Sequence, residues 1–174
     1  DVSALNFDNE AIVINSFSKY FSLTGWRLGW MIVPDYITRT IEKLSQNLFI
    51  CPSHASQILG LFTLNSKTNF DQKVSEYKTN RDILVDSLPN LGFLDIIKPD
   101  GAFYIYANTS NFQQDSKTLA RRILHECGVA ITPGNDFDSL NGHKNVRFSF
   151  ACSTSDVKEA IIRLTKWYEN YKNF

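Results

Sequence analysis

The period of the hydrophobic pattern constrains the fold of this chain more than any other feature of its sequence. Residues 11–14 (AIVI) form a short continuous apolar run, which is typical of a strand buried on both faces. Residues 27–33 form a second strand-like run, which Pro34 closes. A strand buried on both faces needs neighbours, and we expect those of residues 11–14 to lie outside this chain.

Three helical patterns follow these two expected strands. Apolar residues recur three or four positions apart over residues 37–48, 58–62 and 70–88. Pro52 interrupts the first pattern, and Pro89 ends the third. The sequence therefore predicts three consecutive helices.

Strand and helix patterns alternate in the rest of the chain. Residues 98–101 (KPDG) are typical of a turn, and we expect a hairpin in which they join strands at 93–97 and 102–107. Gly128 can end a helix over residues 119–127 in the left-handed conformation. The remaining expected elements are strands at 129–132 and 146–150 and a last helix that starts near Asp156 and buries Val157, Ala160, Ile161, Leu164 and Tyr168. This order predicts an α+β domain whose helices cover an antiparallel or mixed sheet.

Length and charge exclude several classes of function. The 174 residues are 43% hydrophobic, and 18 basic residues balance 18 acidic ones. With no net charge and no run of like charges, the chain offers no electrostatic footprint for nucleic acid or for an anionic membrane surface. No apolar segment is long enough to span a membrane. We therefore expect no nucleic-acid partner and no membrane association.

The cysteines indicate the compartment of the protein. Cys51, Cys127 and Cys152 form an odd and widely spaced set, which is a poor disulfide framework and suits a reducing compartment. Pairs of cysteine and histidine at residues 51–54 and 125–127 lack a matched second pair, so we expect no metal site. These features favour a cytoplasmic protein.

A polar stretch directly after the first expected strand carries the residues best suited to chemistry. A partly desolvated lysine amine can act as a nucleophile, so Lys19 can form an imine with a carbonyl cofactor. Ser16, Ser18 and Arg27 can hold a phosphate dianion, Arg27 through a bidentate ion pair. The spacing alone leaves ordinary alternatives open, because a loop lysine is usually solvated and an arginine usually pairs with a carboxylate.

The same stretch resembles a known family of enzymes. Residues 16–19 (SFSK) and 24–30 (TGWRLGW) are similar to the cofactor-lysine segment of class I/II aminotransferases, the fold-type I enzymes that use pyridoxal 5′-phosphate (PLP). The resemblance implies an enzyme of α/β fold that moves an amino group between an amino acid and a 2-oxo acid. The match is long and specific.

The resemblance also implies a role for each polar residue of this stretch. Lys19 would form the Schiff base with PLP and move a proton between the substrate α-carbon and the cofactor. Arg27 and Ser16 would bind the cofactor phosphate, with Ser18 as a weaker candidate.

Three later segments continue the resemblance in order. Residues 99–104 are similar to the family's small-domain hairpin, and residues 128–137 to the segment that leads back to the active site. Residues 145–151 resemble the strand whose arginine, here Arg147, binds the α-carboxylate of the substrate. Alternation supports this role independently, because it places Arg147 and Ser149 opposite an apolar row made of Val146, Phe148 and Phe150.

The resemblance implies a division of this chain between two domains of a larger enzyme. Residues 1–50 would be the end of the cofactor-binding large domain, residues 51–90 connecting helices, and residues 91–174 the C-terminal small α+β domain. Met31 is the single methionine and the chain begins with Asp1, so we expect it to be part of a longer protein. In the family, the carboxylate that pairs with the pyridine nitrogen lies upstream of the lysine, so we expect this chain alone to be inactive. The full-length enzyme is expected to be a homodimer.

Other readings of the same residues stay open. A PLP-dependent lyase or acyl-condensing synthase of the same fold would share Lys19, Arg27 and Arg147. An aminotransferase-like regulatory module, fused to an upstream domain, would share them too. A plain α+β binding domain would require three ordered matches to arise by chance, so we give it little weight.

Overall fold

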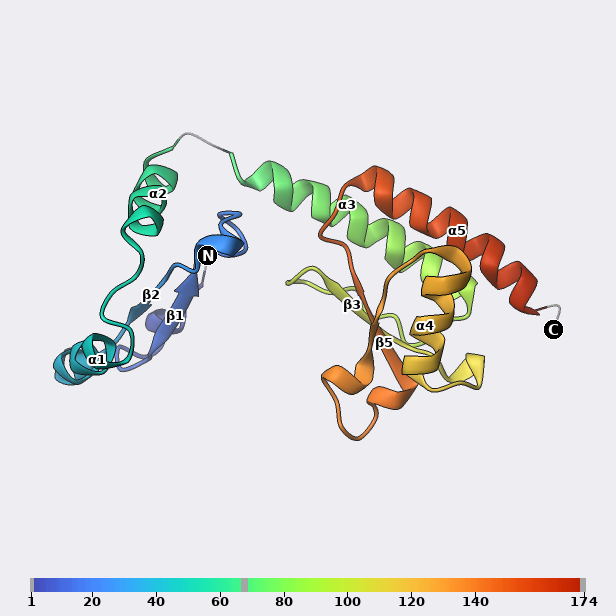
Figure 1. Cartoon of the computed structure of the whole chain (residues 1–174), viewed down its shortest axis with the longest axis horizontal. Coiled ribbons are helices and arrows are strands. Elements are labelled where there is room, and N and C mark those ends of the chain that lie inside the picture. The colour runs from blue at the N-terminus through green and yellow to red at the C-terminus, as the bar shows by residue number, and fades with distance from the viewer. Residues whose placement is uncertain (1, 67–68, 173–174) are drawn as a thin grey trace. The chain divides into compact units, whose positions relative to one another are not determined.

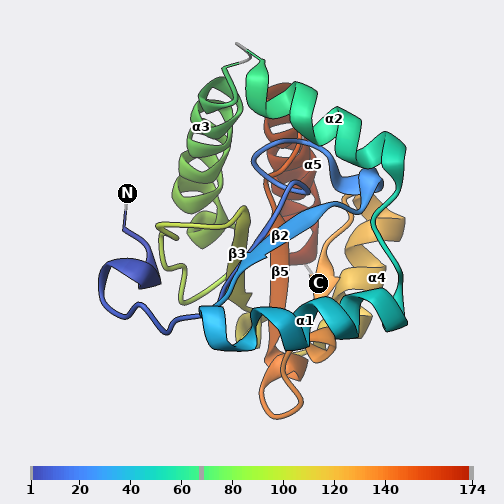
Figure 2. The same ribbon diagram turned by 90° about the vertical axis from the view of Figure 1, so that its left-hand side faces the viewer.

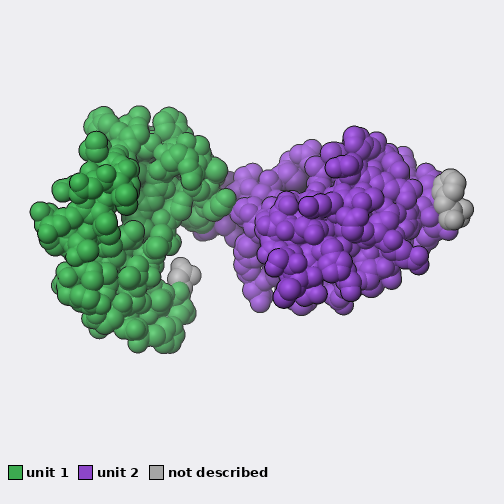
Figure 3. All heavy atoms as spheres, turned by 60° about the horizontal axis from the view of Figure 1, so that its bottom comes forward, with its two compact units in different colours: residues 1–70 green, residues 71–174 purple. Residues whose placement is uncertain are grey.

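The computed structural model describes residues 2–66 and 69–172, and the chain divides into two compact units. Unit 1 is Asp1–Phe70 and unit 2 is Asp71–Phe174 (Figure 3). This division falls inside the predicted connecting segment 51–90, because the helix after residue 70 packs within unit 2. The assignment of residues 1–50, 51–90 and 91–174 to domains of a larger enzyme stays a prediction.

Unit 1 contains one antiparallel pair of strands followed by two helices (Figure 1). The pairing places Asn15 opposite Trp30 and Ser16 opposite Gly29. The predicted strands and the first two predicted helices are confirmed, although the first strand begins at Val13 rather than Ala11. The elements are η1 (Ala4–Asn6), β1 (Val13–Ser16), η2 (Thr24–Trp26), β2 (Gly29–Ile32), α1 (Asp35–Leu48) and α2 (His54–Asn65).

The first strand is not buried on both faces within this chain, so that prediction is wrong for the structure described. Ile14 is 72% exposed, and every residue of β2 is exposed. The reason is that β2 is the one strand paired with β1 among the described residues, and a two-stranded ribbon has no second layer of its own. The expectation that further neighbours lie outside this chain stays a prediction.

Helix α2 fixes the loop that joins β1 to β2. The hydroxyl of Ser56, which is buried, donates a hydrogen bond to the carbonyl oxygen of Trp26 at 2.7 Å. Gly60 lies so close to Leu28 that an added Cβ would be 2.5 Å from the Leu28 Cδ2 atom. The end of the loop is therefore held by packing and by a hydrogen bond from the helix.

Unit 2 is an α+β domain with a three-stranded antiparallel sheet in the order β3-β5-β4. Strands β3 and β5 lie side by side in both ribbon views (Figures 1 and 2), with Tyr106 opposite Arg147. The α+β class and the antiparallel sheet are confirmed. The elements are α3 (Asp71–Ser87), η3 (Leu88–Leu91), β3 (Tyr104–Asn108), η4 (Ser110–Phe112), α4 (Ser116–Cys127), β4 (Thr132–Pro133), η5 (Gly134–Asp136), η6 (Gly142–Lys144), β5 (Asn145–Ser149) and α5 (Thr154–Lys172).

One hydrophobic core joins the sheet of unit 2 to its three long helices. Helix α3 packs on α5 and β3, and α4 packs on α5 and β5. The last helix buries Val157 and Leu164 as predicted, whereas Ala160, Ile161 and Tyr168 are only half-buried. It also buries Trp167, which the periodicity did not predict. The fully buried large side chains include Phe93, Ile105, Phe112, Leu119, Ile123, Val146 and Leu164.

The predicted hairpin around residues 98–101 is wrong in its first arm. Residues 93–97 form no strand, and a single bridge joins Leu94 to Asn108. Asp95 and Ala102 both have left-handed backbone conformations, with φ of 55° and 61°, which interrupt an extended segment. The second arm is confirmed as β3, although it starts at Tyr104.

The ends of α4 carry the expected signals. Asp115 caps the first turn by accepting hydrogen bonds from the backbone N–H groups of Lys117 and Thr118 at 3.1 and 3.2 Å. Gly128 ends the helix in the left-handed conformation, with φ of 68°, as the sequence predicts. The strand residues that follow this helix are thereby set in a fixed direction.

Candidate active site

The loop between β1 and β2 is folded back on itself by backbone hydrogen bonds. The N–H of Phe17 donates to the Leu28 carbonyl, and the N–H of Leu23 donates to the Phe17 carbonyl, both at 3.0 Å. The Phe17 ring is buried and contacts the rings of Phe21 and Trp30 at centroid distances of 5.0 and 5.1 Å. On either side of the buried Phe17, Ser16 is exposed and Ser18 is half-buried.

Three predicted phosphate ligands come together on this loop. The hydroxyl of Ser16 donates to the hydroxyl of Ser18 at 2.9 Å. The Arg27 guanidinium donates to the Ser18 hydroxyl at 3.5 Å and to the Thr24 carbonyl at 2.8 Å. Two hydroxyls and a guanidinium thus lie within one small polar cluster.

Arg27 has no carboxylate partner among the described residues, so the ordinary alternative of a surface ion pair does not apply to it. Its backbone is left-handed, with φ of 50°, an uncommon conformation for a residue other than glycine. That conformation turns the side chain back over the loop, where it reaches Ser18. The guanidinium charge is therefore available to an anion.

Lys19 follows this cluster directly in the chain. Its side chain is exposed, which differs from the partly desolvated amine that the sequence predicts. Its carbonyl accepts a hydrogen bond from the Ser22 N–H at 3.0 Å, so a tight turn fixes the backbone at this residue. The four residues predicted to bind the cofactor lie on one loop of unit 1.

The donor set of this loop fits PLP. A phosphate dianion is bound in proteins by hydroxyl groups and by arginine, whose planar fork of N–H donors matches two phosphate oxygens. Ser16, Ser18 and Arg27 supply these groups, and Lys19, the next residue after Ser18 in the chain, supplies a primary amine. Both ends of the cofactor, phosphate and aldehyde, have a chemically suitable partner here.

Arg147 lies in unit 2, on the sheet face opposite the core. Val146, Phe148 and Phe150 are buried and Ser149 is exposed, so the predicted alternation is confirmed. Among the described residues Arg147 forms no ion pair, which removes the alternative of a strand arginine paired to a surface carboxylate. Its guanidinium contacts two aromatic rings instead.

The structure thus brings together Ser16, Ser18 and Arg27, with Lys19 next to Ser18 in the chain, and it places Arg147 in the other unit. Sequence reasoning missed Thr24, which supports the cluster through two of its groups. The Thr24 hydroxyl donates to the Ser18 carbonyl at 2.5 Å, and the Thr24 backbone carbonyl accepts a hydrogen bond from Arg27. No pattern of spacing marks such a residue, because a loop threonine has no periodicity.

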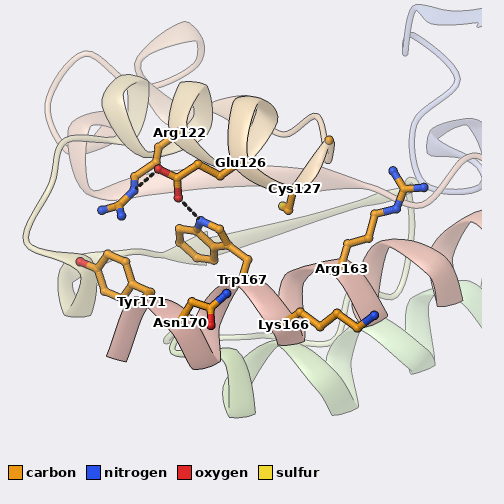
Figure 4. A pocket seen from close by; sticks show the side chains of 9 residues that line it. Arg122, Glu126, Cys127, Arg163, Lys166, Trp167, Asn170 and Tyr171 are labelled. Carbon is orange, nitrogen blue, oxygen red and sulfur yellow. Dashed lines mark hydrogen bonds and ion pairs between the residues drawn. The ribbon is translucent and has the colours of Figure 1, made fainter. Parts of the chain in front are cut away.

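A pocket of about 540 Å³ lies between α4 and α5 (Figure 4). Its carboxylate, Glu126, accepts hydrogen bonds from Trp167 Nε1 at 2.7 Å and from Arg122 Nε at 2.8 Å. Burial opposes ionisation of Glu126, but the hydrogen bonds from Trp167 and Arg122 bring the pKa of its carboxyl below the usual value. These groups satisfy one another and join the two helices.

Within the part of the chain that the structure describes, no group of three or more histidine, cysteine or acidic residues is arranged to hold a metal ion. None of the helices within those same residues has both the length and the apolar character that crossing a membrane requires.

Known proteins resemble this chain over nearly its whole length. It is 43% identical over 159 residues to a valine-pyruvate aminotransferase of Mycobacterium tuberculosis, a match that covers 90% of this chain and 41% of that protein. It is 34% identical over 170 residues to a (5-formylfuran-3-yl)methyl phosphate transaminase of Methanocaldococcus jannaschii, covering 95% of this chain and 45% of the relative. The chain therefore spans less than half the length of these relatives.

Solved structures agree with the sequence matches. The crystal structure of an aminotransferase from Mycobacterium tuberculosis superposes with a TM-score of 0.91 at 39% identity, over 98% of this chain and 44% of that one. The family model of aminotransferase class I and II matches residues 2–164. This chain has part of the fold-type I architecture and belongs to the class I and II aminotransferases.

Proposed function

We propose that this chain is the part of a PLP-dependent aminotransferase that carries the cofactor lysine and the small domain. The observation that carries the proposal is the cluster of Ser16, Ser18 and Arg27, which Lys19 follows directly in the chain. The enzyme moves an amino group from an amino acid to a 2-oxo acid. The relatives named above are aminotransferases, which favours transfer over the lyase and synthase alternatives.

Each residue of unit 1 has one task in this proposal. Arg27, Ser16 and Ser18 bind the phosphate and so fix the cofactor at one end. Lys19 would hold the other end through its Nζ atom, the amine that would react with the cofactor aldehyde. When bound, PLP supplies a ring that accepts electrons from the α-carbon of the substrate. The Lys19 amine would accept the α-proton of the substrate at Nζ and later return it.

Arg147 orients the substrate in this proposal. Its guanidinium binds the α-carboxylate through two parallel hydrogen bonds, which sets the direction of the Cα–H bond toward the proton acceptor. The assignment is supported by the absence of an ion pair to Arg147 among the described residues and by its position on the sheet face away from the core.

The full-length protein is proposed to be a cytoplasmic homodimer. All three cysteines are free, which is consistent with a reducing compartment. We propose that the chain alone does not turn over substrate, because the resemblance puts the partner of the pyridine nitrogen upstream of Lys19. Without that carboxylate the ring is a weaker electron acceptor.

Trapping of the cofactor tests the proposal directly. The 174-residue chain is incubated with PLP and reduced with borohydride, and the modified lysines are mapped by mass spectrometry. We expect modification at Lys19 well above that at Lys43, an exposed lysine of α1 that serves as the internal comparison. Arg27→Ala should reduce the excess at Lys19, whereas Lys43→Ala should leave it unchanged.

The outcome that contradicts the proposal is equal labelling of the two lysines. Because the site of this family is completed by residues outside the present chain, the same comparison is made in a protein of the length of the relatives. Labelling of Lys19 no stronger than that of Lys43 in that longer protein would rule out Lys19 as the cofactor lysine.

A further inference from the structure

The guanidinium of Arg147 lies against two aromatic rings. Its Cζ atom is 4.2 Å from the centroid of the Tyr104 ring and 4.2 Å from the centroid of the Phe137 ring. Its Nε atom is buried and has no hydrogen-bond partner in the part of the chain that the structure describes. The side chain is thus held by ring faces, and neither a carboxylate nor a carbonyl binds the buried nitrogen.

Tyr104 is brought to Arg147 by strand register. Tyr104 pairs with Ser149, and Tyr106 pairs with Arg147, so Tyr104 is the diagonal neighbour of Arg147 on the same sheet face. The distance between diagonal neighbours is within reach of an aromatic ring and a long side chain. This contact is built into the sheet.

Phe137 is brought to Arg147 by a loop that is anchored at several points. Its N–H donates to the Gly134 carbonyl at 2.9 Å. The buried Ser116 hydroxyl contacts Asn135 Oδ1 at 2.6 Å and the Gly142 carbonyl at 2.8 Å, which fastens both ends of the loop to α4. Gly134 and Gly142 approach so closely that an added Cβ on Gly142 would clash with the Gly134 carbonyl group. The loop therefore holds its aromatic residue in one place.

We propose that Tyr104 and Phe137 are positioning residues that fix the orientation of the Arg147 guanidinium. The proposal rests on the function proposed above, in which Arg147 binds a carboxylate. A ring face attracts the cation, and the N–H groups at the guanidinium edge are left for an anion. An arginine already held in one orientation loses less conformational freedom when the carboxylate binds, so binding is tighter.

The fixed orientation also affects specificity. A bidentate hydrogen-bond pair requires the carboxylate to approach in the plane of the guanidinium. With two rings against the guanidinium, that plane is set by unit 2 alone, before substrate arrives. Tyr104 and Phe137 act through Arg147 and do not themselves take part in the proton transfer.

The test follows the Nε–Hε resonance of Arg147 by ¹⁵N NMR in the 174-residue chain, with sodium acetate as the carboxylate probe at constant ionic strength. Arg147→Lys identifies the resonance. We expect the proton to resonate upfield of the other arginine Hε protons, because it lies near ring faces, and to shift saturably with acetate. In Phe137→Leu the upfield position should be largely lost, and acetate binding should weaken about tenfold.

Two further variants separate positioning from general disturbance of the loop. Phe137→Tyr keeps a ring face and should keep both the resonance position and the acetate affinity. Leu140→Ala removes an exposed apolar side chain from the same loop and should change neither. Unchanged resonance and affinity in Phe137→Leu would overturn the proposal. Loss of the upfield position in Phe137→Leu with no acetate response in the unmodified chain would instead overturn the carboxylate role of Arg147 in the proposed function.

Discussion

Units 1 and 2 differ strongly in how many of their large apolar side chains are buried. Among the described residues of unit 1, Phe17 is the only buried large apolar side chain. Unit 2 has one continuous hydrophobic core that includes Phe93, Phe148 and Leu164. In unit 1, strand and helix residues such as Ile14 and Leu48 are more than 70% exposed. Burial of apolar area is the main source of stability, so unit 2 is expected to be the stable part of this chain.

The two units differ in what holds their candidate site residues in place. Unit 2 supplies a rigid sheet face, on which Arg147 is held against two rings without help from the rest of the protein. Unit 1 supplies a loop whose local hydrogen bonds gather the proposed phosphate ligands, and its strands have uncovered faces. A local cluster of donors can form on a small ribbon, whereas a stable core needs several layers.

The largest expected difference between the units comes from truncation of a strand side chain. Phe148→Ala removes a buried ring of β5 that contacts Phe93 at a centroid distance of 5.0 Å. It should lower the free energy of unfolding of unit 2 by about 3–5 kcal/mol. The matched change in unit 1, Ile14→Ala, removes an exposed side chain and should change stability by less than about 0.5 kcal/mol. Chemical denaturation measures both, and equal effects would contradict the division into a closed and an open unit.

Glycine substitutions should give the next largest difference. An added Cβ on Gly134 would lie 2.5 Å from the Tyr106 hydroxyl and 2.6 Å from the carbonyl oxygens of Asn145 and Gly142. Gly134→Ala should therefore destabilise unit 2 by about 1–3 kcal/mol. Gly25→Ala is the control in unit 1, because an added Cβ there meets no atom within 4 Å. A neutral Gly134→Ala variant in thermal unfolding would show that the 134–142 loop is not tightly packed.

Helix caps should give the smallest of these differences. Asp115→Ala removes the side-chain cap of α4 and should lower stability by about 1 kcal/mol. Ser53 stands at the corresponding position of α2 but makes no side-chain cap hydrogen bond, so Ser53→Ala should have almost no effect. Thermal unfolding of the two variants measures both effects. A loss of stability in Ser53→Ala as large as that in Asp115→Ala would show that the side-chain cap hydrogen bond of Asp115 does not account for the effect.

The Asp115 cap also predicts a dependence on pH. The Thr118 hydroxyl, followed by backbone N–H groups, holds the pKa of the Asp115 carboxyl below its usual value, although burial acts weakly against this. A carboxyl with a lowered pKa in the folded state stabilises the fold above its unfolded pKa, and that contribution is lost as the pH falls through the folded value. The stability gap between the unmodified chain and Asp115→Ala should therefore narrow below about pH 4. A gap that stays constant from pH 7 to pH 3 would contradict this account of the cap.

The sequence predicted elements better than it predicted their surroundings. The period of two in residues 146–150 was sufficient to place Arg147 opposite the core, and Gly128 was sufficient to end α4, because both depend on local backbone geometry. The burial of residues 11–14 could not be judged in this way, because burial depends on which other chain segments are present. The hairpin at residues 98–101 was wrong because left-handed conformations at Asp95 and Ala102 leave no mark in the hydrophobic pattern.

The candidate site was predictable to a similar degree. The spacing of Ser16, Ser18 and Arg27 allowed a phosphate site, but only the fold shows that the left-handed turn at Arg27 brings its guanidinium to Ser18. The contact of Phe137 with Arg147 joins residues ten positions apart through a loop without periodicity. Such contacts follow from tertiary structure and have no signal in a single sequence.

Amide hydrogen exchange of the 174-residue chain, read by mass spectrometry, tests the contrast between the two units most directly. Backbone amides in a closed core exchange only through large-scale opening, whereas those in a weakly packed ribbon exchange through local opening. We predict strong protection in α3, β3, α4, β5 and α5 and much weaker protection in β1 and β2. If the amides of β1 and β2 exchanged as slowly as those of β5, unit 1 would be as stable as unit 2, and the contrast between an open unit 1 and a self-sufficient unit 2 would be wrong.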